Sequence, residues 1–369
     1  MIPMLDLKAQ LSSYRDQAIS AMIDVMDSQT FIMGPKVDTF ENHLGTLLGL
    51  PKAVGVSSGT DALLVALMAL DIKAGDEVIM PAFSFFATAG VVARLGAKPI
   101  FVDIHPHTYL MQADACARAI TSKTKAIIPV HLFGQICDLG NLYEDSSAPP
   151  IVEDAAQAIG AKLRGKGTGM LGTLCATSFF PSKNLGGFGD GGAIYGLDEQ
   201  LLEKCRTLRV HGSKQKYHHT MVGGNFRLDA LQASILDIKL QFLESWTKSR
   251  QLNADRYDAM FKQTDLVVKG HINIPQRIDG ATHVFNQYTI KTSKRDELRN
   301  HLLSHGIETM IYYPSPLHTQ PCFSHIGYRL GDFPETEKAC LEVISIPIFP
   351  EITERQQQYI VDTIQGFFK

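Results

Sequence analysis

Between residues 50 and 200, short apolar runs alternate with longer stretches in which apolar residues recur at helical spacing. The short runs predict buried strands, and the longer stretches predict helices. Alternation of this kind is typical of an α/β fold whose mainly parallel sheet is covered by helices on both faces. The predicted strands are Lys52–Val56, Glu77–Met80, Lys98–Val102, Ala126–Val130, Ile151–Glu153 and Leu174–Phe179, and the predicted helices are Asp61–Leu70, Ala87–Leu95, Ala113–Ile120 and Leu139–Asp145.

A long amphipathic pattern opens a second region of the chain. Apolar residues recur at helical spacing from Leu228 to about Lys262 and predict one long helix that bridges two domains. The pattern beyond it indicates a small α+β domain. Its predicted elements are a strand over Val284–Ile290 and helices over Arg295–Ser304 and Glu354–Phe367.

The length of 369 residues suits one large domain and one smaller domain. Two further helices are expected before the alternating region, over Tyr14–Ser28 and Val37–Leu48. We therefore expect a large domain over residues 1–245, which includes these helices, and a small C-terminal α+β domain over residues 246–369.

Composition narrows the class of protein. Hydrophobic residues make up 45% of the chain and charged residues 20%, as in soluble globular proteins. The formal net charge of −3 creates no field that would recruit nucleic acid. No apolar run is long enough to span a bilayer, and no secretory signal pattern opens the chain. We expect a cytoplasmic protein without a nucleic-acid or membrane partner.

The six cysteines are scattered, without a C-x-x-C pair or a histidine at zinc spacing. They are expected to be reduced structural thiols. The adjacent His218 and His219 would point apart on an extended loop, and no acidic partner is in register with them. No metal site is predicted.

Two polar turns follow predicted strands, at the sheet edge where ligands bind in such folds. Lys183 lies between an aromatic, proline-containing approach and a run of glycines, where a lysine of lowered pKa could form an imine with the aldehyde of pyridoxal phosphate. Glu153 and Asp154 end a buried strand, where a carboxylate could keep a pyridine nitrogen protonated. Taken singly, these residues could equally be a solvated turn lysine and a helix-capping acid.

Three further segments could bind parts of a cofactor or substrate. The small residues from Ser57 to Leu63 could hold a phosphate at a helix start or simply cap the helix. The aromatics between Pro81 and Thr88 could stack on a flat ring or pack in the core. Asn225 could reach an anion or pair locally.

A basic stretch is a candidate site for a diphosphate-bearing substrate, although such runs are often solvated faces. Glu203 is the nearest acid to it. The stretch contains Lys204, Arg206, Arg209, His211, Lys214, Lys216, His218 and His219.

Together, these motifs resemble the DegT/DnrJ/StrS family of pyridoxal-phosphate sugar aminotransferases over nearly the whole chain. The resemblance implies an aspartate-aminotransferase-type fold (PLP fold type I) and a homodimer with active sites shared across its interface. The motifs that carry it are Gly34-Pro35, Ser58–Leu63, Glu153–Gln157, Ser178–Lys183, Asn225–Arg227 and Tyr313–His318.

The resemblance also implies roles for individual residues. Lys183 would be the covalent anchor of the cofactor and the base that moves protons, and Asp154 would be the partner of the pyridine nitrogen. The expected cofactor contacts are Gln157 at the ring hydroxyl, Phe85 on the ring face, Gly59, Thr60 and Ser178 at the phosphate, and Asn225 at the phosphate of the neighbouring subunit. The expected substrate contacts are Arg209, His211, Arg227, Tyr312, Tyr313 and His318.

The implied reaction moves an amine from glutamate to a nucleotide-linked keto-sugar. Several segments, among them Val210–Gly212 and His283–Tyr288, are most similar to those of enzymes that act on UDP-linked 3-keto-2-acetamido sugars for surface polysaccharide or lipid A. A dTDP- or UDP-linked 4-keto sugar would also suit the motifs, and a neutral hexose and a uronic acid both stay open. So do a sugar dehydratase and a regulatory protein that holds the cofactor without turnover. Lysine rather than histidine at position 183 favours transamination.

Overall fold

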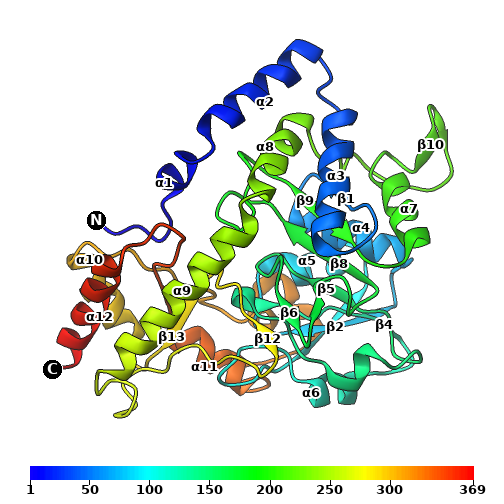
Figure 1. The fold of residues 1–369 in the computed structure, drawn as a ribbon. Coiled ribbons are helices and arrows are strands. Elements are labelled where there is room, and N and C mark those ends of the chain that lie inside the picture. The colour runs from blue at the N-terminus through cyan, green and yellow to red at the C-terminus, as the bar shows by residue number, and fades with distance from the viewer.

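The computed structural model describes residues 1–369, and a seven-stranded mixed sheet lies at the centre of the fold (Figure 1). Parallel bridges from Ile127 to Ile151 and from Val130 to Asp154 join its two halves. All strands run in the same direction except β9, which is antiparallel to both of its neighbours. Across the sheet the strands are β1 (Val54–Val56), β9 (Gly192–Tyr195), β8 (Leu174–Ser178), β5 (Val152–Asp154), β4 (Thr124–Ile127), β2 (Glu77–Pro81) and β3 (Lys98–Val102).

Helices cover both faces of this sheet, because alternate strand residues point to opposite sides. Leu174 and Ala176 belong to a core of 30 buried residues shared with three helices, whereas Cys175 belongs to a core of 23 on the other face. The predicted α/β class is therefore confirmed. The helices on the first face are α4 (Gly59–Ala69), α5 (Phe86–Arg94) and α7 (Glu199–Leu208), and α3 (Pro35–Leu48) and α8 (Ala230–Leu240) cover the second.

The predicted helix from Leu228 to Lys262 is wrong as a single element. It is divided into α8 and α9 (Leu243–Lys262), with Gln241 and Phe242 between them. The Gln241 and Phe242 amides donate to carbonyls three residues back, at 3.3 and 3.0 Å, which tightens the last turn of α8. The apolar spacing continues through the break, and no glycine or proline marks it, so periodicity alone could not locate it.

A second core of 20 buried residues encloses the antiparallel pair β13 (Tyr288–Lys291) and β14 (Val343–Ile346). Ile2 joins this core, and its amide donates to the Gly306 carbonyl at 2.7 Å. Both chain ends accordingly lie on this side of the molecule in Figure 1. The division at residue 245 stays a prediction. The helices around this core are α9, α10 (Arg295–Ser304) and α12 (Glu354–Phe368).

Two other predicted elements differ from the structure. The helix expected over Leu139–Asp145 is only a 3₁₀ turn at Gly140–Tyr143, because Gly140 has a φ of +55°, which is not helical. The strand expected from Val284 begins only at Tyr288, because the preceding loop packs on another loop, where the Val284 amide donates to the Gly134 carbonyl at 2.8 Å.

Among the remaining elements, the hairpin of β10 and β11 projects from the body in Figure 1. No helix has the length and apolar character needed to cross a membrane. The elements not yet named are α1 (Leu7–Leu11), α2 (Arg15–Ser28), α6 (Ala113–Ala119), α11 (Pro334–Glu342), β6 (Lys162–Leu163), β7 (Lys166–Gly167), β10 (Ser213–Gln215), β11 (His218–His219), β12 (Ala281–Thr282) and the 3₁₀ turns Leu132–Gly134, Leu317–Thr319 and Pro321–Ile326.

Candidate active site

Lys183 and Asp154 lie at the carboxyl ends of the paired parallel strands β8 and β5. Asp154 ends β5, and Lys183 lies in the loop that follows β8. Lys183 is partly exposed as a residue, but burial of its amine lowers its pKa to about 8 although the charge of Asp154 raises it. About a tenth of this amine is therefore neutral at pH 7, far more than for a solvated lysine, and the neutral form is the nucleophile.

The Asp154 carboxyl group is buried and held by two donors. The Thr88 hydroxyl donates to Oδ2 at 2.9 Å, and the Ala156 amide donates to Oδ1 at 3.2 Å. Desolvation raises the pKa of Asp154 above its usual range, while both hydrogen bonds and the charge of Lys183 lower it. No cation forms a direct ion pair with this buried acid, so a cationic ligand group would find it free.

Glu153, the other acid of this turn, has a different environment. Its carboxylate is fully buried and accepts hydrogen bonds from the amides of Gly169 and Gly172, at 3.0 and 2.7 Å. It also lies 2.8 Å from His131 Nε2. Because the Cys137 amide donates to Nδ1 of His131, Nε2 carries the proton and donates to Glu153. The protein itself thus satisfies Glu153 and leaves Asp154 for the site.

Gln157 is fixed by two neighbours at the same edge of the sheet. Its Oε1 accepts from the Phe133 amide at 2.6 Å, and its Nε2 donates to the Tyr313 hydroxyl at 3.1 Å. The Tyr313 ring lies 6.1 Å from the ring of Phe85, which is 59% exposed. The exposed Phe85 ring could therefore stack on a flat ligand. Tyr313, which lies beside Phe85, also holds Gln157.

Gly59 and Ser178 meet where α4 begins. A Cβ atom on Gly59 would lie 2.5 Å from Cβ of Ser178, so only glycine permits this approach. The hydroxyls of Ser57 and Ser58 both donate to Asp61, at 2.6 and 3.0 Å, and are used within the helix start. The Ser58 hydroxyl oxygen caps the Asp61 amide at 3.0 Å. The amides of Gly59 and of the exposed Thr60 have no helical partner and remain available to an anion.

Asn225 and Arg227 lie on an extended segment at the edge of the sheet. Arg227 forms an antiparallel bridge with Val56, the last residue of β1, and Asn225 forms one with Val210. This places both next to the strand that leads into Gly59. Asn225 is exposed, and Arg227 has a buried Nε without a partner.

Two expected substrate contacts are wrong. Arg209 is only 4% exposed, forms a buried ion pair with Glu41 and donates to the Gly55 carbonyl at 2.8 Å. His318 is 1% exposed and lies 3.2 Å from Glu337, so neither side chain presents a surface to a substrate. The prediction relied on residue type, which does not show burial.

The basic stretch does not form one positive patch. Lys204 pairs with Asp71 at 2.7 Å, and Arg206 pairs with Glu199 at 2.6 Å. Lys214 also lies near an acid, Glu203, at 3.3 Å. His211 remains exposed at the base of the projecting hairpin. The local charge excess is therefore largely neutralised within the chain.

Sequence reasoning missed Thr88 and His131 as parts of this arrangement. Thr88 holds Asp154 and lies in the first turn of α5, and His131 holds Glu153 just after β4. The aromatic motif from Pro81 to Thr88 could have indicated Thr88, because it begins at the carboxyl end of β2, where ligands bind in such sheets. A single histidine after a strand gives no comparable signal.

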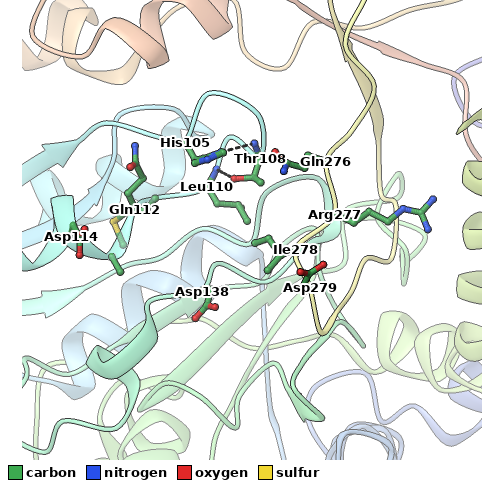
Figure 2. Close-up of a pocket in the computed structure, with 12 residues that line it drawn as sticks. His105, Thr108, Leu110, Gln112, Asp114, Asp138, Gln276, Arg277, Ile278 and Asp279 are labelled. Carbon is green, nitrogen blue, oxygen red and sulfur yellow. Dashed lines mark hydrogen bonds between the residues drawn. The ribbon is translucent and has the colours of Figure 1, made fainter. Parts of the chain in front are cut away.

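A surface cavity of about 450 Å³ lies away from these residues, between the loop of His105 and the segment from Gln276 to Asp279 (Figure 2). Asp138 lines it but pairs with Arg164, and none of the predicted site residues contributes to its walls. This cavity is therefore separate from the candidate site. No group of three or more His, Cys, Asp or Glu side chains is placed to hold a metal ion.

Known relatives cover the whole chain. It is 48% identical to the "Pleiotropic regulatory protein" of Geobacillus stearothermophilus, over all of this chain and 99% of that one. It is 41% identical to an Acidithiobacillus ferrooxidans UDP-N-acetyl-3-dehydro-alpha-D-glucosamine 3-aminotransferase, over 99% and 97% of the two chains. It is 38% identical to a Streptomyces venezuelae dTDP-3-amino-3,4,6-trideoxy-alpha-D-glucose transaminase, over 99% and 95%.

Solved structures agree with this. The crystal structure of S. venezuelae DesV matches with a TM-score of 0.95 and 38% identity, over 99% of this chain and 98% of that one. The structure of a Bacillus subtilis relative with bound cofactor PMP matches with a TM-score of 0.87 and 32% identity, over 96% and 82%. The expected fold type I architecture is confirmed. The family model matches residues 13–365, and the chain belongs to the DegT/DnrJ/EryC1/StrS aminotransferase family.

Proposed function

We propose that this pyridoxal-phosphate-dependent nucleotide-sugar aminotransferase moves an amino group from L-glutamate to C3 of a UDP-linked 3-keto-2-acetamido-hexose or its uronic acid. The observation that carries the aminotransferase assignment is the buried Lys183 amine of lowered pKa beside a buried, unpaired Asp154. The choice of sugar is supported by the 41% identical relative named for a UDP-linked 3-dehydro sugar. The product would serve surface polysaccharide or lipid A synthesis.

The residues at this edge of the sheet fit pyridoxal phosphate. Lys183 offers a partly neutral amine for the aldehyde, and Asp154 offers a buried carboxylate for the ring nitrogen. The amides of Gly59 and Thr60 at the start of α4 have no partner within the protein and would bind the phosphate beside Ser178. Gln157 and Phe85 would contact the ring hydroxyl and the ring face, and Asn225 of a second subunit would reach the phosphate.

When bound, the cofactor supplies an electron sink for the carbon that gains or loses the amine. Lys183 would anchor it, take a proton from the donor carbon and return a proton to the acceptor carbon. Asp154 would keep the ring nitrogen protonated, because its own carboxylate is favoured as an anion only beside a cation. Thr88 and the Ala156 amide would fix the orientation of that carboxylate.

Substrate contacts would come from the expected residues that are not buried in the protein interior. Tyr313 lies beside Gln157, and the ring of Tyr312 lies 5.8 Å from that of Tyr313. Arg227 and His211 lie at the β1 edge and at the base of the hairpin, respectively. We infer that these four residues contact the nucleotide-linked sugar, in place of the larger set that sequence alone indicated.

A dTDP-linked 3-keto sugar is the second candidate, because a relative named for a dTDP-linked 3-amino sugar is 38% identical. Three keto-sugars should be compared with glutamate as donor: UDP-linked 3-keto-N-acetylglucosamine, its uronic acid, and a dTDP-linked 3-keto-6-deoxyhexose. The proposal expects the highest kcat/KM with a UDP-linked substrate. A higher value with the dTDP-linked sugar would replace it, and transfer to none of them while glutamate also leaves the cofactor spectrum unchanged would favour a regulatory protein.

We also propose a homodimer with shared active sites that works in the cytoplasm. Exposed apolar side chains lie close in sequence to the site, among them Phe180 at 52% and Phe188 at 45% exposure. A second subunit that covered them would bury apolar surface and bring its own Asn225 to the facing site. All six cysteines are unpaired, as a reducing compartment requires.

A further inference from the structure

Lys239 is a buried lysine without an acidic partner. It lies near the end of α8 and is 2% exposed. Burial lowers its pKa to about 8, and no carboxylate contributes to that pKa. Lysines are rarely buried unless paired, so the position needs another source of stabilisation.

Three aromatic rings supply part of that stabilisation. The Nζ atom of Lys239 lies 5.5 Å from the ring centroid of Tyr14, 5.8 Å from Trp246 and 6.0 Å from Phe188. Each distance is within the range of a cation–π interaction, which is strengthened where water is excluded. The rings come from three separate segments: the start of α2, the helix α9, and the loop that contains Lys183. We call Tyr14, Trp246 and Phe188 the aromatic cage.

The same ammonium donates a hydrogen bond to the carbonyl of Gly186, three residues after Lys183. Gly186 is tightly enclosed, since a Cβ there would lie 2.3 Å from the Pro181 carbonyl oxygen. A second α8 side chain, Gln232, accepts a hydrogen bond from the Phe188 amide at 2.8 Å. Helix α8 therefore holds the lysine loop at two points that are separate from the cofactor contacts.

The loop also has internal bonds that transmit this attachment. The Lys183 amide donates to the Phe180 carbonyl at 2.8 Å, and the Gly187 amide donates to the Phe179 carbonyl at 2.7 Å. Gly186 lies between the two donor residues, Lys183 and Gly187, so movement of its carbonyl would change the turn that orients the Lys183 side chain. A hydrogen bond from a charged donor in a dry environment resists such movement strongly.

We propose that Lys239 is a positioning residue for the reaction: its caged ammonium clamps the Gly186 carbonyl and thereby fixes the loop that presents the Lys183 amine. The proposal rests on the role proposed for Lys183. It connects the N-terminal segment at Tyr14 to the active-site loop through one charged group. Because the cage is apolar, removal of the charge alone should loosen the loop without changing the cofactor contacts themselves.

The test replaces Lys239 by methionine, which is unbranched and one atom shorter and which removes the charge together with the hydrogen-bond donor. Hydrogen–deuterium exchange of the full-length, cofactor-free protein should show peptides over residues 179–191 exchanging about tenfold faster, and peptides of strands β8 and β9 unchanged. The rate of lysine capture of added pyridoxal phosphate should fall about tenfold. The matched control is Lys248→Met on the exposed face of α9, which should change neither value.

Exchange in the loop within twofold of the wild type would overturn the proposal, and so would a uniform increase over the whole sheet. If Lys239→Met fails to fold, Tyr14→Leu tests the same idea, because it keeps an apolar side chain and removes one aromatic wall that lies outside the measured loop. About threefold faster loop exchange is expected in that variant, and unchanged exchange would overturn the proposal. The exchange readout does not involve Lys183 chemistry. Failure of the Lys183 assignment would appear separately, as cofactor capture that survives Lys183→Met.

Discussion

Thr88 donates its hydroxyl proton to Asp154 at 2.9 Å, and the Ser84 hydroxyl lies 2.8 Å behind it. Since the Thr88 proton is used by Asp154, Ser84 must donate to Thr88, and the three groups form a directed chain. Thr88→Val keeps the side-chain shape and removes the donor. We expect kcat to fall about tenfold, because loss of a hydrogen bond to the anion raises the pKa of Asp154 further. The acid limb of the kcat/KM pH profile should move to higher pH, and an unmoved limb would show that Thr88 does not act on Asp154.

Replacement of Lys183 by methionine should abolish turnover and the absorbance band of the lysine-bound cofactor. The folded-state pKa of about 8 is below the ordinary value of 10.5, so the fold disfavours the charged amine. That cost is fully present below pH 8 and disappears as the pH rises through 10.5. Lys183→Met should therefore be at least as stable as the wild type at pH 7, with an advantage that shrinks at alkaline pH. Urea unfolding at pH 7 and at alkaline pH measures this difference in stability. Normal turnover in Lys183→Met would refute the assignment of Lys183 to the active site.

The pKa of Lys183 also predicts how the cofactor-free protein captures pyridoxal phosphate. Only the neutral amine attacks the aldehyde, so the capture rate should rise with pH around a midpoint near 8. A solvated lysine would give a midpoint near 10.5. Stopped-flow absorbance at fixed cofactor concentration distinguishes the two values.

Arg209 should prove structural. Arg209→Met removes the buried cation that pairs with the Glu41 carboxylate and leaves it only the partly exposed Lys52, at 3.4 Å, and the Gly55 amide. It should cost about 3 kcal/mol of the free energy of unfolding. KM for the sugar should stay within about twofold, because the side chain lies inside the protein. Lys214→Met serves as the exposed comparison, since its pair with Glu203 should contribute less than about 1 kcal/mol. A large rise in KM with unchanged stability would restore the substrate role.

Shared active sites can be tested by mixing two inactive variants. Lys183→Ala and Asn225→Ala affect different subunits of one site if Asn225 reaches across the dimer. Unfolding and refolding an equal mixture should then recover about a quarter of wild-type activity, because half of the dimers are mixed and each has one intact site. Recovery of no activity would place Asn225 in the same subunit as its Lys183.

The sequence predicted the parts of the fold that depend on local pattern. Apolar runs located the strands before Asp154 and Lys183, because buried parallel strands are continuously apolar. The four-residue strand β9 was not predicted, since a short apolar run between glycines has no distinctive period. Arg209 was misassigned for a related reason: its charge is visible in sequence, whereas its burial depends on Glu41, which is 168 residues away.

Strand alternation explains a further limit of the sequence. Glu153 and Asp154 must face opposite sides of β5, but pattern alone does not show which one faces the ligand. The choice depends on His131 and two distant glycine amides that satisfy Glu153. Only the assembled fold shows that these three donors satisfy Glu153, whereas Asp154 is left for a ligand.

The reversed direction of β9 determines what kind of segment the lysine loop is. Ser178 at the end of β8 pairs with Gly192 at the start of β9, so the loop leaves and re-enters the sheet at the carboxyl end of β8. If β9 were parallel to β8, the chain would first have to cross to the other end of the strands. The segment that carries Lys183 is thus a loop that connects two neighbouring antiparallel strands and is held at both ends by their pairing. Changes in its length would alter where the amine points without disturbing the order of the strands.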